Sequence, residues 1–372
     1  MSTSKTGIGG KRHSEALRSL TTTSLALLLL LVGGAWSPAR ATGPALWIAA
    51  PQQLQGPLDA VGGVVEIRPM WLKIGGVVKQ IQVLEGAGGP LVNTSGLAFQ
   101  PNGALWVCTH IAGQQQNNTI LKFGVGQLRN LAVVPLPAPI VTITSTSFEF
   151  NMGCVFDSQG NLWVVEGAGN GVHEISHAQL IAATLAGPAP QNITPAVTIT
   201  STALSSPAFA TFDAGGNLWV TSEGNNNIVE FAATDLGNPA ATPHVIISSP
   251  SVAGPGQPQF DAAGNLWVTN ALNNTVVKFT PAQLAASGSP TADATISDDG
   301  SGSLVTPWGC AFDSLGRLWV LNYSTTATST TATISMFGRG QLAVSGPSSP
   351  TPRQTLDGLQ PFAAQMTFGP RY

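Results

Sequence analysis

One pattern of apolar and polar positions recurs along the chain. It consists of a Phe, an Asp, a short turn with Gly, and the apolar triplet Leu-Trp-Val, as in FDAAGNLWVTN from Phe260. Close copies start at Phe156, Phe212 and Phe312, and a looser copy, FQPNGALWVCT, starts at Phe99. The Trp of each Leu-Trp-Val or Leu-Trp-Ile triplet recurs every 48 to 59 residues, at Trp47, Trp106, Trp163, Trp219, Trp267 and Trp319. Such self-similarity is typical of an architecture built from repeated units.

Each unit is long enough for four short β-strands. The first strand ends at the Phe, a turn with Gly follows because Gly tolerates positive φ, and Leu-Trp-Val forms the second strand. A third strand follows an Asn-rich loop, and the fourth is rich in Val, Ile and Thr. Third strands are expected to end at Phe123, Ile175, Phe231, Phe279 and Phe337, and fourth strands to lie within 139–146, 195–202, 243–250, 292–299 and 352–359. In the first unit these two strands are expected at 62–72 and 77–86.

The Leu-Trp-Val triplet predicts how the units assemble. A sheet with one solvent face alternates apolar and polar residues, whereas a strand that is apolar on successive residues is buried on both faces. Four-stranded sheets stacked face to face around an axis form a β-propeller, and an open solenoid is the alternative. The first unit lacks a strand with Phe, and the C-terminal AAQMTFGPRY supplies one with Phe368. The sequence therefore predicts an all-β fold: a six-bladed β-propeller of four-stranded blades, closed by the C-terminal strand, which completes the N-terminal blade.

The first 41 residues have the pattern of a signal peptide. A basic stretch with Lys11 and Arg12 precedes an apolar run at 25–36, and Ala39-Arg40-Ala41 follows as a cleavage site. The apolar run is short for a membrane span, although an uncleaved anchor is the alternative. We therefore expect a signal peptide at 1–41, a propeller domain at 42–372, a secreted or periplasmic location, and no membrane span after cleavage.

Charge and cysteine content narrow the function classes. Removing residues 1–41 leaves 10 basic and 17 acidic residues, with no clustered Lys/Arg run, which argues against nucleic acid as a partner. Three cysteines, Cys108, Cys154 and Cys310, do not make a disulfide scaffold. Cys154 and Cys310 both stand two residues before the Phe of their units. We expect buried free thiols, with a Cys108–Cys154 disulfide as the alternative.

The repeat resembles a known group of propellers. The series F-D-x-x-G-N-L-W-V, an Asn-rich turn and I/V-x-x-F, over residues 45–372, is similar to NHL-type repeats and to the senescence-marker protein and gluconolactonase superfamily. It is more loosely similar to the streptogramin B lyases. Their repeat has a Glu shortly after Leu-Trp, and in this chain only Glu166 stands at the matching position. The resemblance implies the propeller fold and three classes of activity: ligand binding, lactone hydrolysis and lyase chemistry.

The resemblance also implies where a metal ion would lie. Lactonase-like propellers hold a divalent metal on the axis with acidic and Asn ligands just before the first strand of some blades. The positions four before each Phe in this chain are Ser95, Met152, Ala208, Gly256, Trp308 and Ala364, and none is a carboxylate. Asn151 stands one residue from this position. This pattern therefore does not favour a metal centre of the gluconolactonase type.

Candidate site residues follow from the propeller geometry. Loops that enter the first strand and leave the second strand share one face, where ligands bind at the mouth of the central channel. The candidates for ligand binding on this face are Phe150, Asn151, Glu166, Glu223, Asn270, Trp308, Asn322 and Tyr323. Trp308, Phe150 and Tyr323 can stack on a sugar or an aromatic ligand, or pack the loops over their own blades.

Two further chemistries are open on the same face. Glu166, Glu223 and Asn151 can supply oxygens to a divalent cation such as Ca²⁺, or can be rim and turn residues. His110 is a candidate general base, although no Ser or Cys nucleophile stands at a recognised spacing from it. The leading hypothesis is thus an exported, monomeric binding module for a small molecule, carbohydrate or protein. The alternative is a metal-dependent lactonase or streptogramin lyase-like enzyme.

Overall fold

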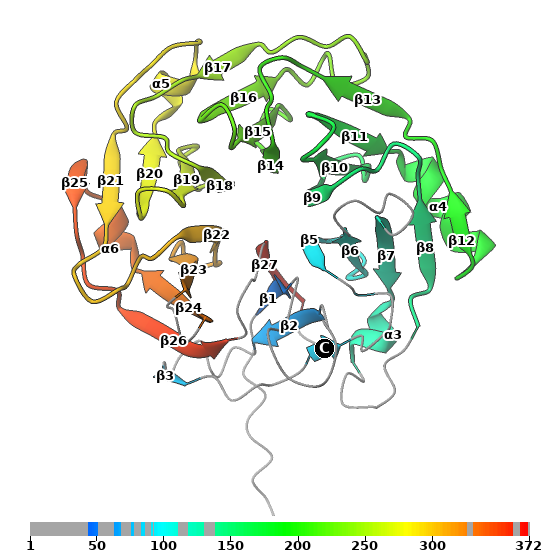
Figure 1. The fold of residues 1–372 in the computed structure, drawn as a ribbon, viewed down its shortest axis with the longest axis horizontal. Helices are drawn as coiled ribbons and strands as arrows, with labels where there is room; N and C mark the ends of the chain where they lie inside the picture. The colour runs from blue at the N-terminus through cyan, green and yellow to red at the C-terminus, as the bar shows by residue number, and fades with distance from the viewer. Residues whose placement is uncertain are drawn as a thin grey trace, which may run out of the picture. The chain divides into compact units, whose positions relative to one another are not determined.

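The computed structural model describes residues 44–50, 63–67, 76–77, 83–85, 91, 93–110, 118–129, 138–325, 330–359 and 365–370. Contacts divide the chain into two units, 1–42 and 43–372, and every described residue lies in the second. Within that unit six sheets form a ring, each with four antiparallel strands and with the first of these strands nearest the axis (Figure 1). The unit is therefore the predicted six-bladed β-propeller.

The six blades are numbered along the chain. Blade 1 contains β27 (Met366–Gly369), β1 (Ala45–Ala50), β2 (Gly63–Ile67) and β4 (Val83–Glu85). Blade 2 contains β5 (Thr94–Phe99), β6 (Leu105–Thr109), β7 (Thr119–Phe123) and β8 (Val141–Thr144). Blade 3 contains β9 (Asn151–Phe156), β10 (Leu162–Glu166), β11 (Gly171–Ile175) and β13 (Val197–Thr200).

The second half of the ring repeats this order. Blade 4 contains β14 (Pro207–Phe212), β15 (Leu218–Ser222), β16 (Asn227–Phe231) and β17 (Val245–Ile247). Blade 5 contains β18 (Pro255–Phe260), β19 (Leu266–Asn270), β20 (Thr275–Phe279) and β21 (Ala294–Ser297). Blade 6 contains β22 (Pro307–Phe312), β23 (Leu318–Thr325), β24 (Thr330–Phe337) and β26 (Gln354–Leu359).

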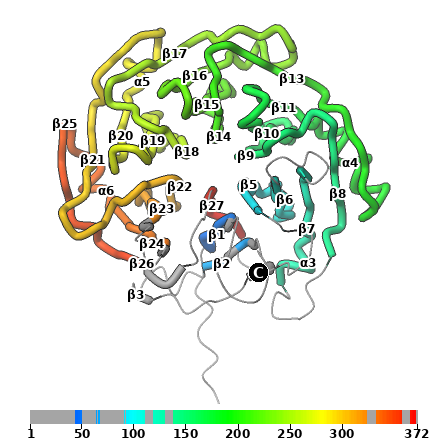
Figure 2. Tube along the Cα trace, viewed as in Figure 1, coloured from blue at the N-terminus to red at the C-terminus, as the bar shows by residue number. Residues whose placement is uncertain are grey.

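The chain ends close the ring as predicted. Strand β27 pairs antiparallel with β1, with Leu46 opposite Phe368, and Figure 2 shows the red C-terminal strand beside the blue N-terminal one. The indole Nε1 of Trp47 donates to the carbonyl of Pro370 at 3.3 Å. Blade 1 is thus built from both ends of the propeller unit, and its innermost strand comes from the C-terminal end.

Neighbouring blades are joined by Trp-to-Phe packing. The Trp of one blade meets the Phe of the next edge-on, with ring centroids 5.3 to 6.4 Å apart at five junctions. These pairs are Trp47–Phe99, Trp163–Phe212, Trp219–Phe260, Trp267–Phe312 and Trp319–Phe368. The six Trp side chains are at most 3% exposed. The predicted interblade core is therefore confirmed.

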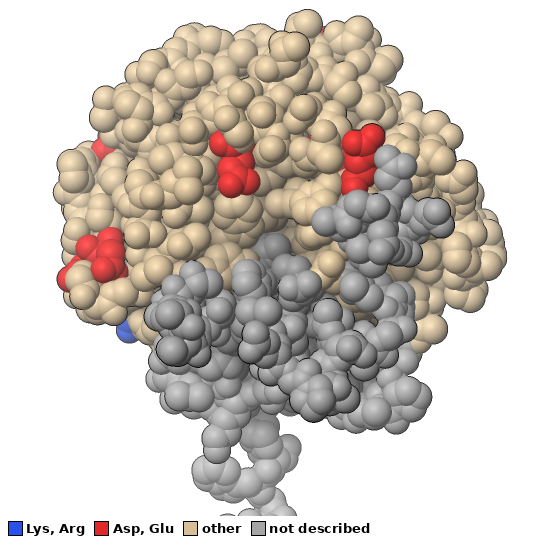
Figure 3. Space-filling model, viewed as in Figure 1, with Lys and Arg blue, Asp and Glu red and all other residues tan. Residues whose placement is uncertain are grey.

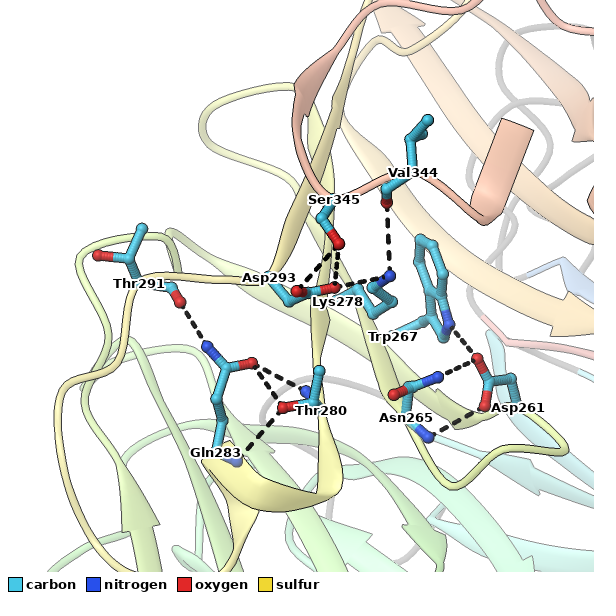
Figure 4. Close-up of polar contacts among 10 residues, drawn as sticks. All are labelled: Asp261, Asn265, Trp267, Lys278, Thr280, Gln283, Thr291, Asp293, Val344 and Ser345. Carbon is cyan, nitrogen blue, oxygen red and sulfur yellow. Dashed lines mark hydrogen bonds and ion pairs between the residues drawn. The ribbon is translucent and has the colours of Figure 1, made fainter. Parts of the chain in front are cut away.

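The Phe-Asp turn explains the polar part of the repeat. In blade 5, Asp261 Oδ2 accepts hydrogen bonds from Trp267 Nε1 and Asn265 Nδ2, both at 2.9 Å (Figure 4). Its Oδ1 accepts the backbone N–H groups of Ala263 and Asn265, and Gly264 adopts φ +79° in the turn. Blades 3 and 4 repeat the network, and blade 6 replaces the Asn with Arg317. One carboxylate thus holds both the turn and the core indole.

The Asn-rich turns of blades 3, 4 and 5 connect each of these blades to the next. Asn170, Asn226 and Asn274 adopt positive φ values of 52° to 56° before their third strands. Their Oδ1 atoms accept the backbone N–H of the next blade's Ser206, Gly254 and Thr306 at 3.0, 2.6 and 2.7 Å. Asn tolerates this conformation better than most residues, so the turn and the interblade bond favour the same side chain.

The connections between third and fourth strands cover outer edges. They contain the helices α3 (Val125–Leu128), α4 (His177–Ala186), α5 (Pro281–Leu284) and α6 (Arg339–Leu342). Three of them add a parallel strand to the preceding blade: β12 (Pro190–Asn192) on blade 2, β25 (Gly346–Ser348) on blade 5 and β3 (Gly76–Val77) on blade 6. The predicted fourth strand at 77–86 is therefore partly wrong, because Val77 pairs with blade 6, whereas 83–85 pair within blade 1 and the other residues of the range lie outside the described ones.

A contact beside β25 shows how these connections are anchored. Lys278 Nζ lies 5.6 Å from the centre of the Trp267 ring and 2.7 Å from Asp293 Oδ2 (Figure 4). The same ammonium donates to the carbonyl of Val344, and Ser345 donates to Asp293.

In the described part of the chain, no helix is long and apolar enough to cross a membrane.

We predict that Asp261→Ala lowers the free energy of unfolding by about 2–3 kcal/mol, because it leaves the Trp267 indole and three further donors without their acceptor. Asp235→Ala is the control, since Asp235 is exposed and its carboxylate accepts only from Thr234. Its expected cost is below about 0.5 kcal/mol. Urea unfolding of both variants measures the difference, and equal costs would contradict this role of the turn.

Candidate functional site

Antiparallel pairing places the predicted site residues at one edge of each blade. Asn151 stands opposite Glu166 in blade 3. Asn270 stands opposite Pro255 in blade 5, and Asn322 stands opposite Pro307 in blade 6. First strands therefore start, and second strands end, on a common face, which we call the channel face.

Two glutamine side chains bridge the first strands around the axis. Gln365 Oε1 accepts the backbone N–H of Leu97 and Cys154 at 3.0 and 3.2 Å, and Gln365 Nε2 donates to the Cys154 carbonyl. Gln257 Oε1 accepts the N–H of Cys310 and Met366, and its Nε2 donates to the Met366 carbonyl. Both side chains are buried, so they link blades 1, 2 and 3 and blades 5, 6 and 1 across the ring interior.

An apolar group lies at the axis beside these amides. It consists of Met152, Ala208, Phe209 and Trp308, which we call the axial cluster. The Trp308 and Phe209 rings meet edge-on with centroids 5.8 Å apart. Ala208 and Phe209 are fully buried, whereas Met152 and Trp308 are half-buried. Three of the four stand four residues before their Phe, one position nearer the channel face than Gln257 and Gln365.

Glycine makes room for this packing. A Cβ on Gly153 would lie 2.6 Å from Cδ1 of Phe209, closer than side chains tolerate. A Cβ on Gly256 would lie 2.4 Å from the carbonyl oxygen of Trp308. The first strands of blades 3 to 6 thus approach one another closely enough to seat Phe209 and Trp308 at the axis.

Glu166 is buried and bonded to backbone. Its Oε2 accepts the N–H of Glu149 at 2.9 Å, and its Oε1 accepts those of Phe150 and Ala168. Burial raises the pKa of Glu166 to about 7, because the loss of hydration outweighs these three hydrogen bonds. The side chain therefore shapes the loop that carries Phe150.

His110 and Asn151 lie beside that loop. The His110 and Phe150 ring centroids are 4.0 Å apart, and burial lowers the pKa of His110 to about 4, so the imidazole is neutral at pH 7. Asn151 Nδ2 donates to the Thr109 carbonyl at 3.4 Å. The buried atoms Asn151 Oδ1 and His110 Nδ1 have no hydrogen-bond partner among the described residues. The structure thus brings His110, Phe150, Asn151 and Glu166 together between blades 2 and 3.

The other predicted residues do not join this group. Glu223 is half-buried in blade 4, burial raises its pKa, and no described contact links its side chain to Glu166. Asn270 and Asn322 are buried and donate to the carbonyls of Ser251 and Ser303 in their own blades. Tyr323 packs against the core of blade 6, and burial raises its pKa.

Charge is sparse at the predicted site. In the described part of the chain, no three His, Cys, Asp or Glu side chains are grouped so that they could hold a metal ion. On the face drawn in Figure 3, the coloured residues include separate acidic side chains and hardly any Lys or Arg. The proposed Ca²⁺ ligands and the roles of the individual site residues stay predictions.

Sequence reasoning missed Met152, Phe209, Gln257 and Gln365 as axial residues. A signal was present, because Gln257 and Gln365 stand three residues before Phe260 and Phe368, where an apolar or Gly residue would otherwise face a packed interior. A polar side chain at such a position implies partners in other blades.

Comparison with solved structures bears on the fold. No protein-family model matches the chain, and no curated protein does either. A protein of unknown function from Bacteroides caccae has a TM-score of 0.58 at 9% identity, covering 89% of this chain and 100% of that one. A nidogen/laminin complex has a TM-score of 0.54 at 11% identity, with 88% and 99% covered. Virginiamycin B lyase from Staphylococcus aureus has a TM-score of 0.42 at 18% identity, with 66% and 69% covered. These likenesses concern the fold alone.

We predict that Glu166→Gln changes the pH dependence of stability. The folded-state pKa of about 7 lies above the ordinary value of 4.5, so between these pH values folding favours the protonated carboxyl. This group's contribution to stability is therefore lost as pH rises through that range. The unfolding free energy of the variant minus that of the wild type should rise by up to about 3 kcal/mol between pH 4.5 and 8.

Urea unfolding at several pH values measures this difference. Glu149→Gln is the control, because it removes an exposed carboxyl whose charge is the smallest of the causes acting on the Glu166 pKa, and it should change the profile less. A difference between Glu166→Gln and wild type that does not vary with pH would contradict the assignment.

Proposed function

We propose that the protein is an exported, monomeric binding module of the NHL-like propeller type. Its channel face would hold an uncharged small molecule or carbohydrate with an apolar or aromatic face. Export is supported by the signal-peptide pattern of residues 1–41, and the propeller type by the repeated F-D-x-x-G-N-L-W-V series. The observation that carries the ligand class is the half-buried Trp308 at the axis.

The axial cluster suits a neutral ligand. The Trp308 ring packs edge-on against Phe209. The backbone carbonyl of Trp308 accepts a hydrogen bond from Thr269 Oγ1 at 2.8 Å. A rigid indole gives a ligand a large contact area at little cost in side-chain entropy. Met152 adds a polarizable surface, and no member of the cluster carries a charge. A charged ligand would lose hydration there without gaining an ion pair.

Nearby polar groups can orient such a ligand. Nδ1 of the neutral His110 imidazole and the amide oxygen of Asn151 are buried polar atoms without a hydrogen-bond partner among the described residues, so they can bond to a ligand group that enters between blades 2 and 3. These atoms lie between blades 2 and 3. Met152, which follows Asn151 in β9 of blade 3, belongs to the axial cluster, so the polar atoms and the cluster are neighbours along this strand. Sugars combine an apolar ring face with hydroxyl groups, so they match this arrangement.

The alternative is a lactonase-like or streptogramin lyase-like enzyme. It is favoured by the contacts that both His110 and Glu166 make with Phe150, because a neutral imidazole can accept a proton and a carboxyl with a raised pKa can donate one. Turnover of lactones or cyclic esters that needs millimolar Ca²⁺ and is lost with EDTA would replace the binding function with this activity.

We predict that Trp308→Ala weakens ligand binding at least about tenfold, since stacking on an indole contributes about 1.4 kcal/mol or more. The probes are neutral aryl glycosides and soluble oligosaccharides, measured by calorimetry and ligand-observed NMR. Leu315→Ala is the control, because Leu315 is exposed on the turn at the opposite end of β22.

Binding by the wild type and by Leu315→Ala, with loss in Trp308→Ala, would support the proposal. No binding of any neutral probe, or equal binding by all three proteins, would contradict it.

A further inference from the structure

We propose that Cys108 and Cys154 become joined by a disulfide when the chain folds in an oxidising environment, so that blades 2 and 3 are covalently linked. All three cysteines are free and buried in the structure. Cys108 lies in β6, one residue before its end, and Cys154 lies in β9, the innermost strand of the next blade. The inference concerns a covalent link between blades and is independent of the ligand-binding proposal.

The repeat itself places these two thiols together. The residue after Leu-Trp-Val in one blade packs in the same cluster as the residue two before the Phe of the next blade. The pair is Val165 with Ala210 between blades 3 and 4, and Leu321 with Met366 between blades 6 and 1. Cys108 and Cys154 occupy these two positions between blades 2 and 3, and they share one cluster. Interaction with the Cys154 side chain is one of the causes that raise the pKa of Cys108.

The backbone allows the close approach that a disulfide needs. Gly96 stands opposite Cys108 in the pairing of β5 with β6. A Cβ on Gly96 would lie 2.9 Å from the backbone nitrogen of Cys154, so only Gly permits this spacing. A disulfide requires Cβ atoms roughly 3.5–4.5 Å apart, which demands such proximity of two strands.

Burial decides when the bond forms. Neither thiol is more than 1% exposed, and burial together with contact with Cys154 raises the pKa of Cys108, so Cys108 is seldom a thiolate in the folded protein. The bond is therefore made while blades 2 and 3 pack. One thiolate attacks a small-molecule or protein disulfide and releases the first thiol, and the second thiolate attacks the mixed disulfide and releases the second. The two cysteines lose two hydrogens, and the donor disulfide is reduced to two thiols.

Cys310 provides an internal control. It occupies in blade 6 the position that Cys154 occupies in blade 3, but the matching residue of the preceding blade is Thr269 rather than a cysteine. Its thiol contacts the carbonyl of Gln257 at 3.1 Å. Cys310 should therefore stay free under conditions that oxidise the other two.

The test is to refold the reduced full chain in a buffer of oxidised and reduced glutathione, denature it, alkylate it and determine its mass. We expect one alkylated cysteine, Cys310, and a peptide map that joins Cys108 to Cys154. Cys310→Ala should form the same disulfide with no alkylation. The paired change Cys108→Val with Cys154→Ala, which copies the Val165–Ala210 pair, should form none.

A second measurement tests the link in the folded state. Reduction under denaturing conditions followed by refolding with reductant should lower the melting temperature of the wild type by about 5 °C, because a crosslink restricts the unfolded chain. The Val/Ala variant should show no such shift. Three alkylated cysteines in refolded wild type, or a disulfide that includes Cys310, would overturn the proposal.

Discussion

At five junctions a blade packs its Trp edge-on against the Phe of the next blade, and the rest of the structure depends on this contact. A buried Trp removes about 150–250 Å² from water, which corresponds to roughly 4–6 kcal/mol of hydrophobic stabilisation. A blade has a Trp side and a Phe side, so it needs a neighbour on both. A ring satisfies every blade, and an open stack would expose one surface at each end. Strand β27 meets this need because Phe368 packs on Trp319 while its backbone pairs with β1.

The same closure shapes the candidate site. Six first strands converge on one axis, so the interior has room for few side chains and requires Gly at positions such as Gly153. Gln257 and Gln365 use their amides to satisfy backbone groups of other blades there. Above them, Trp308 stays half-buried, and Glu166 holds the neighbouring loop through backbone bonds. The proposed binding surface is thus a consequence of how the ring closes.

Much of the fold could be predicted from the sequence, since the repeat marks first, second and third strands with Phe, Trp and Asn-rich turns. The closure of the ring could be predicted because the first repeat lacks a strand with Phe and the C-terminal segment supplies one with Phe368. The parallel strands β12, β25 and β3 could not be predicted, because segments such as Pro190–Asn192 have no strand pattern of their own and pair only with another blade. For the site, the sequence predicted that Asn151 and Glu166 share one face of the propeller. It could not show that the Glu166 oxygens accept from the backbone of a preceding loop, or that Gln365 reaches Cys154 across the ring.

Removing the closing strand tests the account most directly. A chain that ends at residue 364 lacks Gln365 and Phe368, and with them the inner strand of blade 1. Comparison of its thermal unfolding with that of the full chain, by circular dichroism, is the decisive measurement. The ring account predicts a chain that is unfolded or melts at least about 10 °C lower. A cooperative transition at the temperature of the full chain would show that the blades do not depend on closure.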